Sequence, residues 1–246
     1  MTANLESVCR DLKELKLSVM AANLPSVITE ATRSNQNILH TFKLLLEFER
    51  EARWKNSIDR RFLLSRLTEK VTIDQFDFLH HESRQQQKNA ILGLLSLDFI
   101  EQRKDVIFIG NPGTGKSMLG KAIAFAACNH NRKVLFTTAA DMINHLTAAD
   151  ADSSLLKKLQ VYQTPDLLVC DELGYLPLGQ QGSNLFFQVI SARHKQRSTI
   201  VTTNLPFAEW GKVFDSNTTA VAIADRLVHN TEVVILGGPS YRRKHK

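Results

Sequence analysis

Cysteine is scarce in this 246-residue chain, and long apolar runs are missing from it. Cys9, Cys128 and Cys170 stand far apart and form no C-x-x-C pair, so the pattern predicts neither a disulfide framework nor a structural zinc site. Every apolar run is shorter than the roughly 18 residues that a membrane-spanning helix needs. The first residues also lack the apolar centre of a signal peptide, so we expect a cytoplasmic protein with no membrane partner.

A strong excess of one charge is also missing. Lys and Arg number 31 against 25 Asp and Glu, the formal net charge is +6, and 43% of the residues are hydrophobic. This composition is globular, and its mild positive bias fits a polyanionic partner as well as it fits ordinary solvated helix faces. The basic residues gather near the C-terminus and in one N-terminal stretch, at Arg50, Arg53, Lys55, Arg60, Arg61 and Arg66.

One stretch, GNPGTGKS, fits the phosphate-binding pattern G-x-x-x-x-G-K-[ST] between an apolar run at 106–109 and a helical pattern. This context predicts a loop whose backbone N–H groups surround a polyphosphate at a helix N-terminus. Lys116 would reach the β- and γ-phosphates, and the Ser117 hydroxyl would complete a Mg²⁺ shell. The predicted nucleotide-binding residues are Gly110, Asn111, Pro112, Gly113, Thr114, Gly115, Lys116, Ser117 and Met118.

The chain around this loop alternates apolar runs with helical patterns, which predicts an α/β domain with a parallel sheet. The short apolar runs are typical of strands covered on both faces. We expect five strands, at 106–109, 134–137, 167–170, 199–202 and 233–236. Helices are expected near 117–129, 139–146, 153–163, 183–194, 207–213 and 219–228.

The residues before this domain have helical spacing of apolar side chains. Pro25 is expected to break the first helix from the second, and a third helix is expected from about Asn56. We therefore predict a small all-α N-terminal domain over residues 1–70. Residues 71–246 would form the second domain, which begins with a connecting segment and a helix. His80 and His81 in that segment lack acidic or cysteine partners at ligand spacing, so we do not expect a metal site there.

Two adjacent carboxylates end the third predicted strand, at the sheet edge where ligands bind in such folds. Asp171 would hold Mg²⁺, directly or through water, or support Ser117, since Mg²⁺ keeps several waters and takes few protein carboxylates. Glu172 points elsewhere and can polarise an attacking water. The alternative is that the pair only caps the following turn.

A polar residue, Asn204, follows the fourth predicted strand, which we expect to lie between the two phosphate-site strands. Its amide can bind the attacking water or the γ-phosphate, although an Asx-turn before Pro206 is an alternative. Arg226 and Arg242 can stabilise transition-state charge on the γ-phosphate, and an arginine supplied by a neighbouring subunit would make hydrolysis depend on assembly. Taken alone, either arginine also fits a surface or salt-bridged position.

Several longer segments are more specific than the phosphate loop. They are DELGYLPL (171–178), FFQVISARHKQRSTIVTTNLPFAEW (186–210), ADRLVHN (224–230), GGPSYRRK (237–244) and, near the N-terminus, LKELKLSVMAANLPSV (12–27) and LLEFEREAR (45–53). With these segments the chain resembles the IstB-type helper ATPases of bacterial insertion sequences over nearly its whole length.

This resemblance implies an AAA+ ATPase of the clade that includes replication initiators and helicase loaders of the DnaC type. The departures from the family pattern are small, since Asn111 replaces a common proline and Ser117 a common threonine. Carried over by position, the family roles are a Walker A loop at Gly110 to Ser117, a Walker B pair at Asp171 and Glu172, sensor 1 at Asn204, an arginine finger at Arg226 and the sensor 2 arginine at Arg242.

The resemblance also implies a function. Such proteins assemble on duplex DNA with ATP and Mg²⁺, as homo-oligomers with the arginine finger in trans, and present the DNA to a partner transposase. We expect binding without strong sequence specificity, with the basic residues from Arg50 to Arg66 contributing phosphate contacts. Two alternatives stay open here, a replicative helicase loader of the DnaC type and a scaffold that binds ATP without hydrolysing it.

Overall fold

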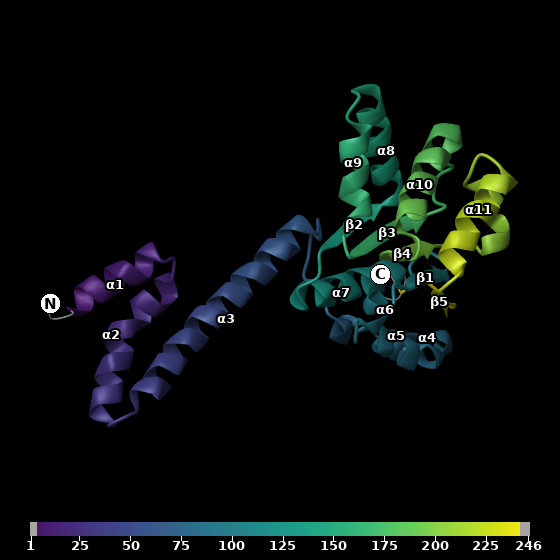
Figure 1. Ribbon diagram of the computed structural model, residues 1–246. Coiled ribbons are helices and arrows are strands. Elements are labelled where there is room, and N and C mark those ends of the chain that lie inside the picture. Colours follow the sequence, from purple (N-terminus) through teal and green to yellow (C-terminus); the bar gives the residue numbers. More distant parts are fainter. Residues whose placement is uncertain (1–3, 242–246) are drawn as a thin grey trace. The chain divides into compact units, whose positions relative to one another are not determined.

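The structure, a computed structural model, describes residues 4–241 and divides into two compact units, Met1–Arg60 and Arg61–Lys246 (Figure 1). The division falls within the long helix α3 (Ile38–Leu64), earlier than the predicted boundary after residue 70. Phe62 and Leu67 lie between the two positions and pack in a core of the second unit, where Phe62 meets the ring of Phe125 edge-on. No helix within residues 4–241 is long and apolar enough to cross a membrane.

The first unit consists of α1 (Leu5–Glu14), α2 (Ser18–Arg33) and the first part of α3. Its small core comes from amphipathic spacing on α2, where Met20, Leu24 and Val27 are buried against Leu45 of α3. The Asn4 side chain caps α1 by accepting the Glu6 N–H. These helices confirm the predicted all-α segment ahead of the sheet.

Two helix boundaries predicted in this unit are wrong. Pro25 lies inside α2, and residues 38–64 form one continuous helix without a second start near Asn56. A proline removes one helical hydrogen bond, but Leu24 and Val27 beside it are buried, so packing keeps the helix intact.

The true start of α2 is set by a residue far along the chain. Glu49 Oε2 on α3 accepts the N–H groups of Val19 (3.0 Å) and Met20 (3.1 Å). These are two of the N–H groups that a helix leaves unpaired at its first turn. Arg53 in turn donates to Glu49 Oε1 at 2.8 Å, and this bond holds the pKa of Glu49 below its ordinary value.

The second unit opens with short elements rather than the predicted connecting segment and single helix. They are η1 (Ile73–Gln75), η2 (Phe78–His80), α4 (Glu82–Gln86), α5 (Lys88–Leu94) and α6 (Asp98–Glu101). The His81 side chain caps α4, with its Nδ1 accepting the Ser83 N–H at 3.1 Å. The polar stretch from residue 80 to residue 89 is therefore ordered and partly helical.

A five-stranded parallel sheet forms the centre of this unit and confirms the predicted fold class. In chain order its strands are β1 (Asp105–Gly110), β2 (Val134–Thr138), β3 (Leu167–Leu173), β4 (Ser198–Thr203) and β5 (Thr231–Leu236). Their order across the sheet is β2-β3-β4-β1-β5. As predicted, β4 lies between β3 and β1, the two strands that carry the phosphate-site motifs. The polar residues that follow these strands therefore share one edge.

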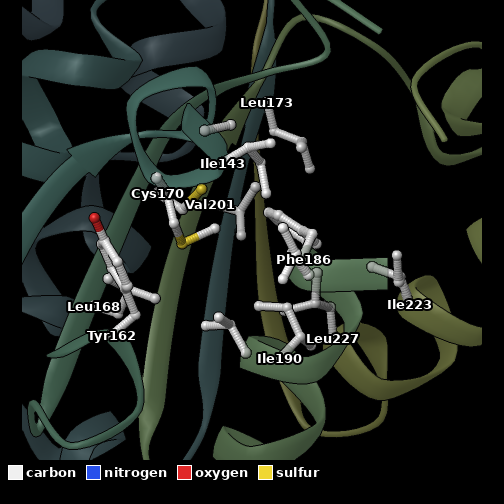
Figure 2. Packing of buried hydrophobic residues seen from close by; sticks show 14 of the residues in the cluster. Ile143, Tyr162, Leu168, Cys170, Leu173, Phe186, Ile190, Val201, Ile223 and Leu227 are labelled. Carbon is white, nitrogen blue, oxygen red and sulfur yellow. The ribbon is translucent and has the colours of Figure 1, made fainter. Parts of the chain in front are cut away.

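Helices cover both faces of the sheet (Figure 1). On β1 the side chains alternate, so Val106 and Phe108 face the core shared with α5, α6 and α7 (Lys116–Asn129). Ile107 faces the opposite core, part of which Figure 2 shows, with Ile143 and Phe186 meeting Val201 of the sheet. That second core takes its helices from α8 (Ala139–Ala151), α9 (Leu155–Gln163), α10 (Gly179–Arg193) and α11 (Asn217–Val228). The residues predicted as a helix at 207–213 form the 3₁₀ helix η3 (Phe207–Lys212).

Candidate nucleotide-binding site

The phosphate loop leaves β1 at Gly110 and enters α7 at Lys116. Gly113 (φ 81°) and Gly115 (φ 97°) have left-handed backbone conformations, which glycine adopts at little steric cost. A side chain on Gly113 would also collide with Ser240. The Lys116 ammonium donates to the carbonyls of Gly110 (2.7 Å) and Asn111 (2.9 Å), folded over the loop. The loop thus presents a helix N-terminus and a cation together, the combination that binds phosphate.

A chain of hydrogen bonds joins this loop to the neighbouring strands. Ser117 Oγ donates to Asp171 Oδ1 over 2.9 Å, and the Thr202 hydroxyl on β4 donates to the same oxygen. Thr202 Oγ1 also accepts the Glu172 N–H at 3.0 Å. One hydroxyl therefore fixes both acidic residues of β3. The pairing of one serine oxygen with one carboxylate oxygen suits Mg²⁺, which takes few protein ligands and completes its shell with phosphate and water oxygens.

Glu172 and Asn204 face the same cleft. The register of β3 against β4 shifts between Cys170 and Leu173, and Glu172 has a left-handed backbone (φ 60°) at this bulge. A bulge re-aims a side chain, which explains how adjacent Asp171 is buried while Glu172 is exposed. The cleft holds about 400 Å³ and is lined by Pro112, Gly113, Lys116, Ser117, Glu172, Tyr175, Thr202, Thr203 and Asn204.

The two predicted arginines are placed differently. Arg226 on α11 donates to its own helix at Ala222 O (2.8 Å), and its guanidinium lies 4.5 Å from the centre of the Phe187 ring on α10. It is not among the residues that line the cleft. Arg242 lies outside the described residues. Its neighbour Tyr241 donates its backbone N–H to Gly113 O at 2.9 Å, so the described chain ends against the phosphate loop.

The predicted DNA-contacting residues divide between the two units. Arg50, Arg53, Lys55 and Arg60 belong to the first unit, and Arg61 and Arg66 to the second. Arg53 is held by structural contacts, since besides Glu49 it binds Lys16 O at 2.7 Å. Arg50, one turn away, is exposed.

Sequence reasoning missed a second part of the site, which comes from the segment ahead of the sheet. A hollow of about 180 Å³ adjoins the phosphate loop, and its lining includes Phe76, Arg84, Met118 and Tyr241 beside Lys116 and Ser117. Arg84 donates to Asp77 O (2.8 Å) and to Thr114 O within the loop (2.9 Å). Nothing in the local sequence pattern marks this arginine, because its partners come from distant parts of the chain.

Comparisons with solved structures agree on the fold. The crystal structure of the DnaC helicase loader matches with a TM-score of 0.59 at 22% identity, covering 68% of this chain and 96% of that chain. The AMPPCP-bound DnaA of Aquifex aeolicus matches with a TM-score of 0.57 at 17% identity, covering 68% of this chain and 50% of that chain. These matches confirm the AAA+ fold that the resemblance predicts.

Sequence comparisons identify the family as well as the fold. An insertion sequence IS232 protein of Bacillus thuringiensis subsp. berliner, whose name describes it as ATP-binding, is 34% identical over 99% of this chain and 97% of its own length. An insertion sequence IS5376 protein of Geobacillus stearothermophilus with the same description is 36% identical over 94% of this chain and 92% of its own length. Residues 10–246 match the sequence family described as IstB-like ATP binding protein. The chain belongs to this family of ATP-binding proteins of insertion sequences.

Proposed function

We propose that this protein hydrolyses ATP with Mg²⁺ and uses the cycle to time its assembly on duplex DNA, which it delivers to the transposase of its insertion sequence. The observation that carries the proposal is the hydrogen-bonded chain from Ser117 through Asp171 and Thr202 to Glu172. A site that only binds nucleotide needs no exposed carboxylate next to the phosphate loop. Here Glu172 shares the cleft with Lys116 and Asn204.

Five residues in or next to the cleft have roles that their chemistry allows. Lys116 binds the β- and γ-phosphates once its ammonium turns from the loop carbonyls to the nucleotide. Ser117 and Asp171 would hold Mg²⁺, which supplies charge neutralisation on the phosphates. Glu172 accepts the proton of the attacking water, and Asn204 orients that water or the γ-phosphate through its amide.

Completion of this site requires a second copy of the chain. Arg226 does not line the cleft of its own chain. Its guanidinium lies on α11 and packs over the Phe187 ring of α10. Supplied by a neighbouring subunit, its guanidinium stabilises transition-state charge and makes hydrolysis depend on assembly. ATP then favours association, and loss of the γ-phosphate releases the interface.

Two parts of the proposal, DNA binding and delivery to the transposase, are supported by membership of the family and by the positive net charge of the chain. The relatives are named as insertion-sequence proteins, and the chain carries a net charge of +6. Contacts from Arg and Lys to phosphates give binding that does not depend on sequence, which suits a protein that accepts many target sites. The helicase-loader alternative gains nothing from the likeness to DnaC, because a match at 22% identity shows the fold alone.

A phosphate-release assay without DNA, with random-sequence duplex DNA and with single-stranded DNA tests the proposal. We expect Mg²⁺-dependent release that rises when duplex DNA is added, and none from Lys116→Ala. Stimulation by single strands alone would favour the helicase loader. Tight ATP binding without phosphate release under any DNA condition would favour the scaffold and contradict the proposal.

A further inference from the structure

Arg84 is a charged side chain with almost no contact with solvent. It lies on α4, and only 2% of its surface is exposed. Its hydrogen-bond acceptors within residues 4–241 are the carbonyls of Asp77 (2.8 Å) and Thr114 (2.9 Å), and no carboxylate there forms a salt bridge with it. Burial lowers the pKa of Arg84, and the nearby Asp77 carboxylate offsets part of this effect without forming a salt bridge. A buried guanidinium without a salt-bridged carboxylate is costly to keep, so its position calls for a further anion or a structural task.

The Thr114 carbonyl, which accepts a hydrogen bond from Arg84, lies in the middle of the phosphate loop. Thr114 stands between Gly113 and Gly115, whose left-handed conformations set the direction of the loop N–H groups. A planar guanidinium holds its donors in a rigid fork and so fixes the directions of two carbonyls at once, whereas the donors of an ammonium rotate about its stem. Through Thr114, Arg84 fixes the peptide plane in the middle of the phosphate-binding turn.

The same guanidinium stands between two aromatic rings. It lies 4.6 Å from the centre of the Phe76 ring and 5.2 Å from that of Tyr241, distances at which cation–π attraction operates. The Tyr241 backbone N–H binds Gly113 O at 2.9 Å. Arg84 therefore links the segment ahead of the sheet, the phosphate loop and the end of the described chain.

The short helix α4 holds this end of the chain at a second point. Ser83 Oγ, next to Arg84, donates to Gly237 O at 3.0 Å. Gly238 has a φ of 98° and lies so close to the His81 ring that a side chain there would collide with it. Residues 81 to 84 therefore hold the turn that leads from β5 to Tyr241, through the Ser83 hydrogen bond and the His81 contact.

Arg84 also borders one of the two hollows at the phosphate loop. It lines the 180 Å³ hollow together with Lys116, Ser117 and Met118. A fixed positive charge in a site shielded from water attracts an anion more strongly than the same charge at a surface. A bound triphosphate would therefore add a second counter-charge to that of the Asp77 carboxylate, which lines the same hollow.

We propose that Arg84 is a positioning residue for nucleotide binding, whose guanidinium fork holds the phosphate loop and Tyr241 in the arrangement that receives the triphosphate. The inference rests on ATP binding by this loop and not on hydrolysis, DNA binding or the arginine finger. Its failure would therefore leave the proposed function in place, and phosphate release by the wild-type protein tests that function separately.

The test compares Arg84→Lys with Arg193→Lys. Arg193 is a matched control because it is also buried and carbonyl-bound, with acceptors at Tyr162, Pro165 and Ser198, but it lies in a different part of the unit, away from both hollows at the loop. Both variants should lower the unfolding temperature. Only Arg84→Lys should weaken binding of ATP and of inorganic triphosphate to the folded protein, by about tenfold or more, the effect of one or two lost charge-assisted hydrogen bonds.

Calorimetric titration well below the unfolding temperature gives the dissociation constants. Wild-type affinity in folded Arg84→Lys, or equal weakening in both variants, would overturn the proposal. Should Arg84→Lys fail to fold, Tyr241→Leu decides, because it removes the ring beside the guanidinium while keeping the backbone N–H bond to Gly113. A severalfold weaker triphosphate affinity in that variant is expected, and an unchanged affinity would contradict the proposal.

Discussion

Ser117 Oγ donates a hydrogen bond to Asp171 Oδ1 over 2.9 Å, so the phosphate loop and the acidic end of β3 are joined before any nucleotide contact is considered. Asp171 is only 5% exposed, and Thr202 binds the same oxygen. Hydrogen bonds and burial therefore hold these two side chains in place. The proposed Mg²⁺ role of these two residues leads to the first prediction.

Asp171→Asn should remove Mg²⁺-dependent hydrolysis while keeping the local shape. The amide is nearly isosteric but a far weaker ligand for Mg²⁺, so phosphate release should fall on the order of a hundredfold. Asp166→Asn is the control, since Asp166 pairs with Arg197 (2.6 Å) just ahead of β3, at the opposite end of that strand. Measuring phosphate release against Mg²⁺ concentration checks this. Similar losses in the two variants would mean that Asp171 matters only for folding.

Glu172→Gln and Lys116→Ala should have opposite effects on DNA retention. Without the general base, phosphate release should fall by about a hundredfold or more while ATP still binds, so Glu172→Gln should remain assembled on duplex DNA. Lys116→Ala loses the phosphate contact and should not assemble. Co-sedimentation with long duplex DNA in the presence of ATP separates the two. Equal retention of both variants would contradict a hydrolysis-timed release.

Arg226→Ala should abolish hydrolysis with little change in ATP affinity. Removal of an arginine finger slows phosphoryl transfer about a thousandfold. ATP affinity should change little because Arg226 lies outside the cleft of its own chain. Mixing Arg226→Ala with Glu172→Gln, which still binds ATP and assembles, should restore part of the turnover, because the Glu172→Gln subunit supplies Arg226 to the intact site of its neighbour. If the mixture stays inactive, Arg226 does not act across subunits.

Phe187→Leu should reduce turnover in the same way as Arg226→Ala, but less strongly. The Phe187 ring lies under the Arg226 guanidinium at 4.5 Å, and leucine keeps the packing but not the cation–π attraction. We expect a smaller loss of turnover than in Arg226→Ala, at unchanged ATP affinity.

Asp105 should make stability depend on pH. Burial raises its pKa from 3.8 to about 7, although the carboxylate accepts the Thr199 N–H at 2.6 Å. Between these values the folded protein holds a proton that the unfolded chain has lost, so the free energy of unfolding falls as pH rises through this window. Asp105→Asn lacks this titration, so its stability relative to wild type should rise between about pH 4 and about pH 7. Urea unfolding at several pH values checks this, and a constant difference would contradict it.

Arg50 and Arg53 offer a matched pair for DNA binding. Arg53 is tied to Glu49 and to Lys16 O, so Arg53→Gln should lower the stability of the first unit. Arg50 is exposed, so Arg50→Gln should leave stability unchanged and reduce the slope of log affinity against log salt by about 1. Unfolding curves and salt titrations of duplex binding distinguish the two. An unchanged salt slope in Arg50→Gln would remove that residue from the DNA surface.

The sheet could be predicted because its signals are local. Each strand contains a short apolar stretch, and the phosphate loop fixes where β1 ends and α7 begins. The position of β4 between β3 and β1 also agrees with the prediction, which places Asn204 beside the loop.

What the sequence did not reveal depends on distant partners. The start of α2 is capped by Glu49 from α3, which no local signal marks. Pro25 does not break this helix because Leu24 and Val27 beside it are buried in the core of the unit. Arg84 belongs to the site only because folding brings its guanidinium to the Thr114 carbonyl. The bulge that separates Glu172 from Asp171 likewise arises from pairing with β4.

Binding of fluorescent random-sequence duplexes with ATP, with ADP and without nucleotide tests the central claim of ATP-timed assembly most directly. We predict tight binding with ATP, similar affinities for unrelated sequences, steep weakening by salt, and release when ATP is hydrolysed. Binding that is indifferent to the nucleotide, or confined to one sequence and insensitive to salt, would contradict it.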